Sequence, residues 1–374
     1  MTFSPARSGK PKVVINALHA KSGGGVTYLR SILRYFGEDP DLEFHLFLHE
    51  EQYDLFAPIP EGVHLHLLDF RSSFITLLAW EQFAMPFLTR LMSADVTFSP
   101  ANYGPLFAPN TVILLRNALS VVGGERRLRK RLYWAGVAAM TWLSLVMSKR
   151  AIAVSRYAGR HLTFGTNRLF GRHTEIVYHG VDARFRPSRR PDRENPFLLV
   201  VSDIYVQKNL HNLIAALPTV LEHHPDIRLK IAGRPNDEDY YNDLRETTRL
   251  LKVDHRIDFL GHCDTERLIE LYDTCLLLVF PSTVETFGNP LVEAMACAVP
   301  IASSNSAAMP EIAGNAAVFF DPLDSDEIAE RLIELVGDTA LAKRLSRAGA
   351  ERAGRFSWKI TAERTCRVLK ASAR

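Results

Sequence analysis

Short hydrophobic runs rich in valine, isoleucine and leucine alternate along the chain with longer segments whose apolar residues recur every three or four positions. The short runs are typical of buried strands, and the longer segments of helices that bury one face. In the first half, this pattern predicts helices over Val26–Phe36, Ser73–Met92 and Arg126–Met147. It predicts strands over Lys12–Leu18, Glu43–His49, Val63–Asp69, Asp95–Ser99, Thr111–Leu115, Ala151–Ser155 and Glu175–Tyr178. Ser155 is a candidate cap for a helix that follows its strand.

The same rhythm restarts in the second half. Strands are predicted over Phe197–Ser202, Ile227–Ala232, Ile257–Gly261, Cys275–Phe280, Pro300–Ser303 and Val318–Phe320. Helices are predicted over Leu210–His223, Thr265–Asp273, Pro290–Ala298 and most of residues 325–372.

Residues 183–196 interrupt the pattern, because this segment is rich in proline and charge and has no apolar period. It is the best linker in the sequence. Alternating strands and helices on both sides of it predict an α/β fold of two doubly wound, Rossmann-like domains that face each other across a cleft. In that architecture ligands bind at the carboxyl ends of the strands.

Composition narrows the class further. The chain has 374 residues, of which 47% are hydrophobic and 23% charged, as in soluble globular proteins. The longest apolar run, 132–147, covers about 16 residues and is too short for a membrane span. The chain opens on polar residues rather than a secretory signal, and its four cysteines lack metal-binding spacing. We therefore expect free thiols in a reducing cytoplasm.

The two halves differ in charge. Residues 1–190 carry 24 Lys+Arg against 14 Asp+Glu, whereas residues 191–374 carry 21 against 28. A basic first half favours an anionic lipid, an anionic substrate or nucleic acid, although compositional drift would give the same asymmetry.

A candidate phosphate site follows the predicted strand that ends at Phe280. We predict Asn289 as the N-cap of the next helix and Pro290 as its first residue. The N–H groups of Leu291 and the residue after it would then be unpaired donors, and Gly288 would let an anion approach the backbone. An ordinary capped helix explains the same pattern.

Two carboxylates flank this site. Glu285 precedes the predicted helix and Glu293 lies one turn inside it. Carboxylates repel phosphate but accept hydrogen bonds from sugar or ribose hydroxyls. The alternative is a pair of surface glutamates.

Cations and glycines supply further candidates. Lys208 follows a buried strand, and Arg234 follows the next one, so both are placed to balance a diphosphate. Gly23, Gly24 and Gly25 lie between the first strand and helix, where they allow close approach of a ligand. They do not form the G-x-G-x-x-G motif of dinucleotide-binding dehydrogenases, and a structural turn explains them equally well.

Taken together, these segments resemble the retaining glycosyltransferases of the two-Rossmann-domain (GT-B) type, family 4. Glu285 and Glu293 match the family's E-x7-E pattern within PSTVETFGNPLVEAMACAVPIASSNSAAMPEIAG. Lys208-Asn209, Val177–Asp182, Ala153–Ser155 and the closing FSWKITAERTCRVL also match. The resemblance spans nearly the whole chain and is thinner before residue 150.

The resemblance implies an N-terminal acceptor domain (1–183), a C-terminal donor domain (184–356) and a last helix (357–374) that returns to the first domain. It implies a hexosyltransferase that moves a sugar from a nucleotide diphospho-sugar to a glycan or lipid-linked acceptor with retention, in cell-envelope or exopolysaccharide biosynthesis. Such enzymes usually work without a metal ion or other cofactor, and we expect no metal ligands and no nucleic-acid partner here. We expect the acidic residues Asp237–Asp239 to lie in a solvated loop rather than to bind a metal ion.

The resemblance also implies roles for individual residues. Glu293 would bind the ribose, Glu285 the donor sugar and Lys208 the diphosphate. The remaining donor-site residues that it implies are Phe287, Gly288, Asn289, Pro290, Leu291, Arg234, Gly23, Gly24, Gly25 and Asn117.

This chain departs from the family pattern at three places. Ser202-Asp203 replaces the usual Gly-Arg, and Arg234 is the candidate substitute for the lost cation. Arg116-Asn117 replaces a common His-Asp pair, and His179 replaces an asparagine at the predicted hinge.

Residues 126–150 join a cation cluster to an apolar helix that carries Trp134 and Trp142. Such a helix suits peripheral attachment to the cytoplasmic face of an anionic membrane, although a buried core helix is the alternative. Two other functions stay open: a nucleotide-sugar epimerase on the same fold, and a catalytically weak nucleotide-sugar-binding protein.

Overall fold

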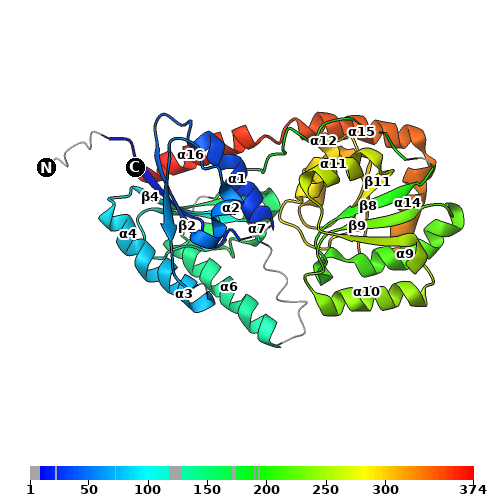
Figure 1. The fold of residues 1–374 in the computed structure, drawn as a ribbon, viewed down its shortest axis with the longest axis horizontal. Helices are drawn as coiled ribbons and strands as arrows, with labels where there is room; N and C mark the ends of the chain where they lie inside the picture. The colour runs from blue at the N-terminus through cyan, green and yellow to red at the C-terminus, as the bar shows by residue number, and fades with distance from the viewer. Residues whose placement is uncertain are drawn as a thin grey trace. The chain divides into compact units, whose positions relative to one another are not determined.

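The structure is a computed structural model that describes residues 9–21, 23–71, 73–117, 128–170, 174–188, 190–192 and 194–374. The chain forms two compact units: unit 1 is Met1–His179 with Trp358–Arg374, and unit 2 is Gly180–Ser357. Each unit has a parallel sheet with helices on both faces (Figure 1). The predicted α/β class with two parallel-sheet domains is confirmed.

Unit 1 contains a seven-stranded sheet in the order β3-β2-β1-β4-β5-β6-β7. The chain winds outward from β1 in one direction and from β4 in the other, so the order reverses between these two strands. Most strands lie within one to three residues of their predicted bounds. They are β1 (Lys12–Asn16), β2 (Glu43–His49), β3 (Val63–Leu68), β4 (Val96–Ser99), β5 (Thr111–Leu115), β6 (Arg150–Ala153) and β7 (Thr174–Ile176).

The helices of unit 1 include those that the apolar period predicts over 26–36, 73–92, 126–147 and the last part of 325–372, and several short ones that it does not predict. They are α1 (Gly23–Phe36), α2 (Tyr53–Phe56), α3 (Phe74–Ala79), α4 (Met85–Leu91), α6 (Leu128–Met147), α7 (Arg156–His161), α8 (Thr166–Phe170) and α16 (Trp358–Ala373). Ser155 caps α7 through its hydroxyl, as predicted. The predicted helix 73–92 is divided by a π turn at Trp80–Ala84.

Unit 2 contains a six-stranded sheet in the order β10-β9-β8-β11-β12-β13, so its order reverses between β8 and β11. Its strands are β8 (Phe197–Val201), β9 (Arg228–Ala232), β10 (Ile257–Gly261), β11 (Leu277–Phe280), β12 (Ile301–Ser304) and β13 (Ala317–Phe320). Its helices are α9 (Leu210–His223), α10 (Glu238–Leu250), α11 (Thr265–Thr274), α12 (Asn289–Ala296), α13 (Met309–Ala313), α14 (Ser325–Gly337) and α15 (Thr339–Ala353).

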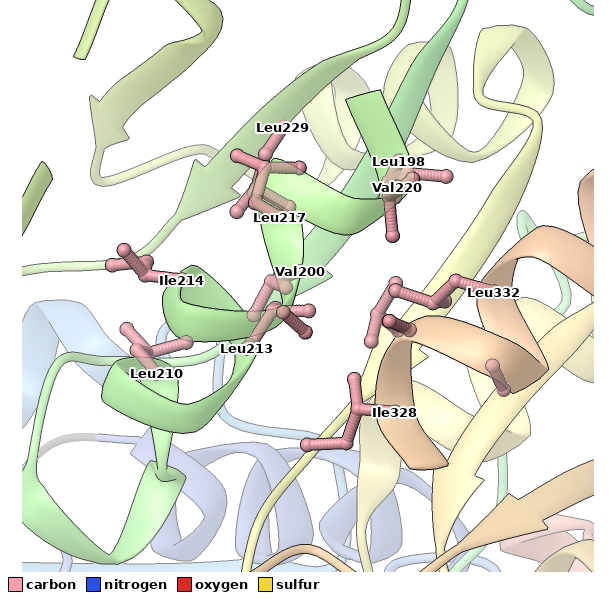
Figure 2. Close-up of a cluster of buried hydrophobic side chains, with 14 of the residues drawn as sticks. Leu198, Val200, Leu210, Leu213, Ile214, Leu217, Val220, Leu229, Ile328 and Leu332 are labelled. Atoms are coloured by element: carbon pink, nitrogen blue, oxygen red, sulfur yellow. The ribbon is translucent and has the colours of Figure 1, made fainter. Parts of the chain in front are cut away.

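The core of unit 2 fixes the positions of these elements. Leu213 and Leu217 of α9 and Leu332 of α14 are fully buried in one cluster with side chains of β8 and β9 (Figure 2). Because α9 follows β8 directly, this packing sets the course of the loop between them. That loop carries Lys208.

Two expectations about local structure are wrong. The glycines 23–25 do not lie in a loop before the first helix, since they form the first turn of α1. Asp237–Asp239 is not a solvated loop, because α10 begins at Glu238 and Asp237 is its buried N-cap residue. Acidic residues favour a helix N-terminus through the helix dipole, which explains this start.

The described residues of the segment 183–196 contain no helix or strand, and they are fastened to unit 2. The N–H groups of Arg190 and Asp192 donate to the carbonyls of Asp273 and Thr274, both at 2.9 Å. In unit 1, Trp358 of α16 lies beside the buried His179, with ring centroids 5.4 Å apart.

The cysteines behave as free thiols. Cys275, Cys297 and Cys366 are buried, and Cys263 is half-buried.

Candidate functional site

The carboxyl edge of the unit 2 sheet brings together the two residues that the sequence singled out for catalysis. Lys208 ends a short 3₁₀ turn after β8, and Glu285 lies in the loop after β11. The ammonium of Lys208 donates to a carboxylate oxygen of Glu285, and both side chains are about four-fifths buried, with exposures of 19% and 18%. The pair therefore sits where the strand order reverses, the usual binding crevice of such sheets.

Asn209 holds these loops in place. It adopts a left-handed conformation with φ of 57° and is fully buried. Its side-chain amide donates to the carbonyls of Pro281, at 3.0 Å, and Pro322, at 2.5 Å. A second link joins the same loops, because the Thr283 N–H donates to the carbonyl of Gln207 at 3.0 Å. The sequence flagged Asn209 only as part of a motif; its role as a clamp required the structure.

The start of α12 differs from the prediction by one residue. Gly288, with φ of +86°, is the N-cap residue, and Asn289 is the first residue of the helix. The N–H of Leu291 donates to the carbonyl of Gly288 at 3.0 Å, so it is not the unpaired donor that we expected. Phe287 is buried, and its ring contacts that of Phe356 with centroids 5.7 Å apart.

Glu293 is half-buried on α12. The Tyr272 hydroxyl donates to its carboxylate at 3.0 Å. Burial outweighs this hydrogen bond and raises the pKa of Glu293 to about 7. Glu293 is therefore a half-buried acceptor whose charge changes near neutral pH.

The Ser202-Asp203 departure has a structural explanation. The Asp203 carboxylate accepts the Arg234 N–H at 2.9 Å and the Asn236 amide at 3.0 Å. This shapes the loop after β9 and leaves the Arg234 side chain exposed. A Cβ on Gly233 would lie 1.9 Å from the Ser202 carbonyl oxygen, so only glycine lets the two loops approach this closely.

In unit 1, Gly25 makes room for a cation. A Cβ at this position would lie 2.4 Å from the guanidinium of Arg116. Arg116 also donates from Nε to the Pro100 carbonyl at 3.0 Å, and burial lowers its pKa. The Asn102 side chain accepts the N–H groups of Arg116 and Asn117, both at 2.9 Å. Asn117 itself is exposed. The glycine turn thus places a guanidinium beside the N-terminus of α1.

Unit 1 also contains an apolar cavity of about 640 Å³ near the carboxyl ends of β1, β3 and β4. Side chains from α3 and α6 form two of its walls. Its lining residues are His19, Lys21, Ser73, Leu77, Leu78, Tyr103, Leu132, Tyr133, Gly136, Val137 and Met140.

A buried carboxylate lies next to this cavity. Glu81 is fully buried in the π turn, where it accepts the Asn16 side-chain amide at 2.8 Å. The His19 Nε2 lies 3.0 Å from the same oxygen. The sequence analysis missed both Glu81 and His19. The available signal was a single acid within the apolar stretch 73–92.

The predicted membrane segment is described in part. Arg126 and Arg127 lie outside the described residues. The helix α6 exposes large apolar side chains, namely Leu132, Tyr133, Trp142, Leu143 and Met147. Within the described ranges, no helix combines the length and apolar character needed to cross a bilayer.

Glycogen synthase from Mycobacterium tuberculosis is 32% identical over 204 residues, which cover 53% of this chain and 49% of that protein. The chain thus spans about half the length of this curated relative.

Two solved structures share the fold over nearly their whole length. HepE from Anabaena, solved in complex with UDP-glucose, is 19% identical with a TM-score of 0.71, covering 96% of this chain and 99% of that one. WaaG, a glycosyltransferase involved in lipopolysaccharide biosynthesis, is 14% identical with a TM-score of 0.74 and the same coverage. The chain therefore has the GT-B fold. Residues 181–352 match the family described as Glycosyl transferases group 1.

Proposed function

We propose that this protein is a retaining glycosyltransferase that moves a hexose from a nucleotide diphospho-sugar to an acceptor hydroxyl. The observation that carries the proposal is the Lys208–Glu285 ion pair at the β8/β11 crevice, within the residues that match glycosyl transferases group 1. The UDP-glucose bound to HepE and the glycogen synthase relative support a nucleotide-sugar donor.

The donor would bind by separating the ion pair and giving each of its two charged groups a new partner. A diphosphate would take the Lys208 ammonium, and a donor sugar hydroxyl would donate to the freed oxygen of Glu285. Each charged group thereby keeps a hydrogen-bonded partner, which limits the cost of desolvation. The N-terminus of α12, with Gly288, Asn289 and Pro290, adds a positive dipole end close to the phosphates. These groups and Arg234 supply the positive charge that a divalent ion provides elsewhere, so we propose a metal-independent reaction.

Glu293 would accept the ribose hydroxyls, and its ionised form is the better acceptor. Retention is proposed from the family resemblance. Because no carboxylate is assigned as nucleophile, we propose a transfer without a covalent glycosyl-enzyme intermediate. The epimerase alternative has less support, because both the domain match and the relative are glycosyltransferases.

The cavity of unit 1 suggests the chemistry of the acceptor. Its walls are mainly alkyl and aromatic, whereas Lys21 and His19 add polar groups. We propose that it holds the apolar part of a lipid-linked or aryl-linked glycan. WaaG is involved in lipopolysaccharide biosynthesis, which supports a lipid-linked acceptor. The exposed apolar side chains of α6 would then rest on the cytoplasmic leaflet from which such an acceptor comes.

Lys208→Ala should lower the transfer rate by about 10²–10³, because one preorganised charge that stabilises the leaving diphosphate is lost. The assay follows hexose transfer from UDP, GDP and ADP sugars to a lipid-linked acceptor, with NMR of the product. Lys343→Ala, an exposed lysine on α15, is the control and should match the wild type. Activity of Lys208→Ala within twofold of the control excludes the role, and an inverted anomeric centre excludes retention.

Glu293→Gln should change how stability depends on pH. The wild-type carboxyl has a pKa of about 7 when folded against 4.5 in its ordinary state, so the folded chain binds more protons between these values. The free energy of unfolding of the wild type therefore falls as pH rises between these two pKa values. The glutamine variant has no carboxyl group to ionise at this position, so it does not lose this stability. Relative to wild type, the variant should gain up to about 3 kcal/mol between pH 5 and pH 8.

Urea unfolding at the two pH values measures this difference. Exposed Glu246→Gln on α10 is the control and should follow the wild type. A constant difference between Glu293→Gln and wild type would mean that the carboxyl is not perturbed.

Gly136→Leu should fill the unit 1 cavity without harming the fold, because no atom lies within 4 Å of the position of its Cβ. We expect the KM for a lipid-linked acceptor to rise at least about tenfold, while nucleotide affinity stays unchanged. Ala139→Leu, on the exposed side of the same helix, also introduces a leucine but outside the cavity, and it should leave KM unchanged. Equal KM values for the two variants would remove the cavity from the acceptor site.

Anionic vesicles should sediment the protein at low salt and release it at high salt, because each surface cation adds about 1 kcal/mol at such a leaflet. The matched variant changes Arg126, Arg127, Arg129, Lys130 and Arg131 to glutamine. Equal sedimentation of variant and wild type would show that this segment does not bind the membrane.

A further inference from the structure

Three histidines and a glutamate share one face of the β2–β3 edge of the unit 1 sheet. The strands pair in parallel, with His45 opposite His64 and Phe47 opposite His66. Because side chains alternate along a strand, Glu43 and His45 point to the same side. The pairing brings His64 and His66 to that side too.

The imidazoles are close and ordered. The Nε2 of His45 lies 2.7 Å from a Glu43 carboxylate oxygen, and its Nδ1 lies 2.9 Å from the Nε2 of His66. The rings of His45 and His64 stack with centroids 4.8 Å apart. One ligand atom from each of Glu43, His45 and His64 lies within 4.8 Å of the other two.

We propose that Glu43, His45 and His64 bind a zinc ion and that His66 orients the His45 ring. Two imidazoles and a carboxylate are ligands that Zn²⁺ prefers, and three protein ligands leave a fourth position for water. With bonds of about 2 Å, the ligand atoms of a tetrahedral site lie about 3.3 Å apart, so only modest side-chain rotations are needed. The proton on Nδ1 of His45 would then be donated to His66, as metal-bound imidazoles usually donate to a neighbour.

One charge opposes this ion. The Lys12 ammonium lies 3.7 Å from the Glu43 carboxylate. It also donates to the carbonyl of Met92 at 3.1 Å, so it has another partner when Glu43 turns to the metal. Lys12 therefore tunes the affinity of the site downward, and its removal should tighten zinc binding.

The location indicates what the ion does. Glu43, His45 and His64 lie at the amino ends of their strands, whereas the unit 1 cavity lies near the carboxyl ends. β3 is the edge strand of the sheet. A shared ion would fasten this edge strand to β2 through their side chains. The site is independent of sugar transfer.

Zinc titration of the tag-free, chelator-treated full chain tests the proposal. We expect one Zn²⁺ per chain by calorimetry and a higher midpoint of thermal unfolding when zinc is present. His64→Gln should weaken binding more than about tenfold, and His66→Gln about 10–100-fold. Lys12→Gln should bind zinc more tightly than the wild type.

His262→Gln, an exposed histidine in unit 2, is the matched control and should bind zinc as the wild type does. His64 is exposed, so its replacement should not unfold the chain, and circular dichroism checks this. The spectrum of the Co²⁺-loaded wild type identifies the ligands without any substitution. Absence of micromolar zinc binding, unchanged binding by His64→Gln, or thiolate bands in the cobalt spectrum would overturn the site.

Discussion

The candidate site depends on one buried amide. Asn209 bonds through its side chain to carbonyls of the loops after β11 and β13, while its own backbone ends the loop after β8. Its left-handed conformation is tolerated by asparagine better than by most other residues. Without that turn, the chain would not bring Lys208 back over the sheet before α9 begins. Three loops from three strands are thereby held as one rigid edge, which is what preorganised electrostatics requires.

The strands were predictable because their sequence pattern favours a buried strand over any other secondary structure. The predicted bounds of β2, β5 and β10 match the structure, since their runs are rich in apolar residues and bounded by polar or turn residues. The helix α10 was missed because its sequence, EDYYNDLRETTRL, is mostly polar and buries few residues. Its helical state depends on a narrow contact with the core that involves Tyr240 and Leu244. Periodicity is a weak signal when the buried stripe is that narrow.

The candidate site was predictable in its residues but not in its contacts. Lys208, Glu285 and Glu293 are identified by strand–loop–helix order, because parallel strands end at one edge. The contacts at this site join residues that are distant in sequence. The Tyr272 hydroxyl donates to Glu293, and the Asp203 carboxylate accepts a backbone N–H from the loop after β9. The same limit explains why Glu81 and His19 escaped notice, because β2, β3 and the helices α1, α2 and α3 separate them along the chain.

The π turn at Trp80–Ala84 has a consequence for how this segment tolerates changes of length. A π turn contains one residue more than an α turn, so it rotates the next helix, α4, by about 100° relative to an uninterrupted helix. Met85 and Thr89 are buried in this rotated frame, whereas Phe83 and Phe87 point to solvent. Deleting one residue here would rotate α4 by about 100° and turn Met85 and Thr89 away from the buried side. The number of residues between Ser73 and Leu91 is therefore fixed, and this segment should not tolerate even a one-residue deletion. The loops at either end of the segment would absorb such a deletion.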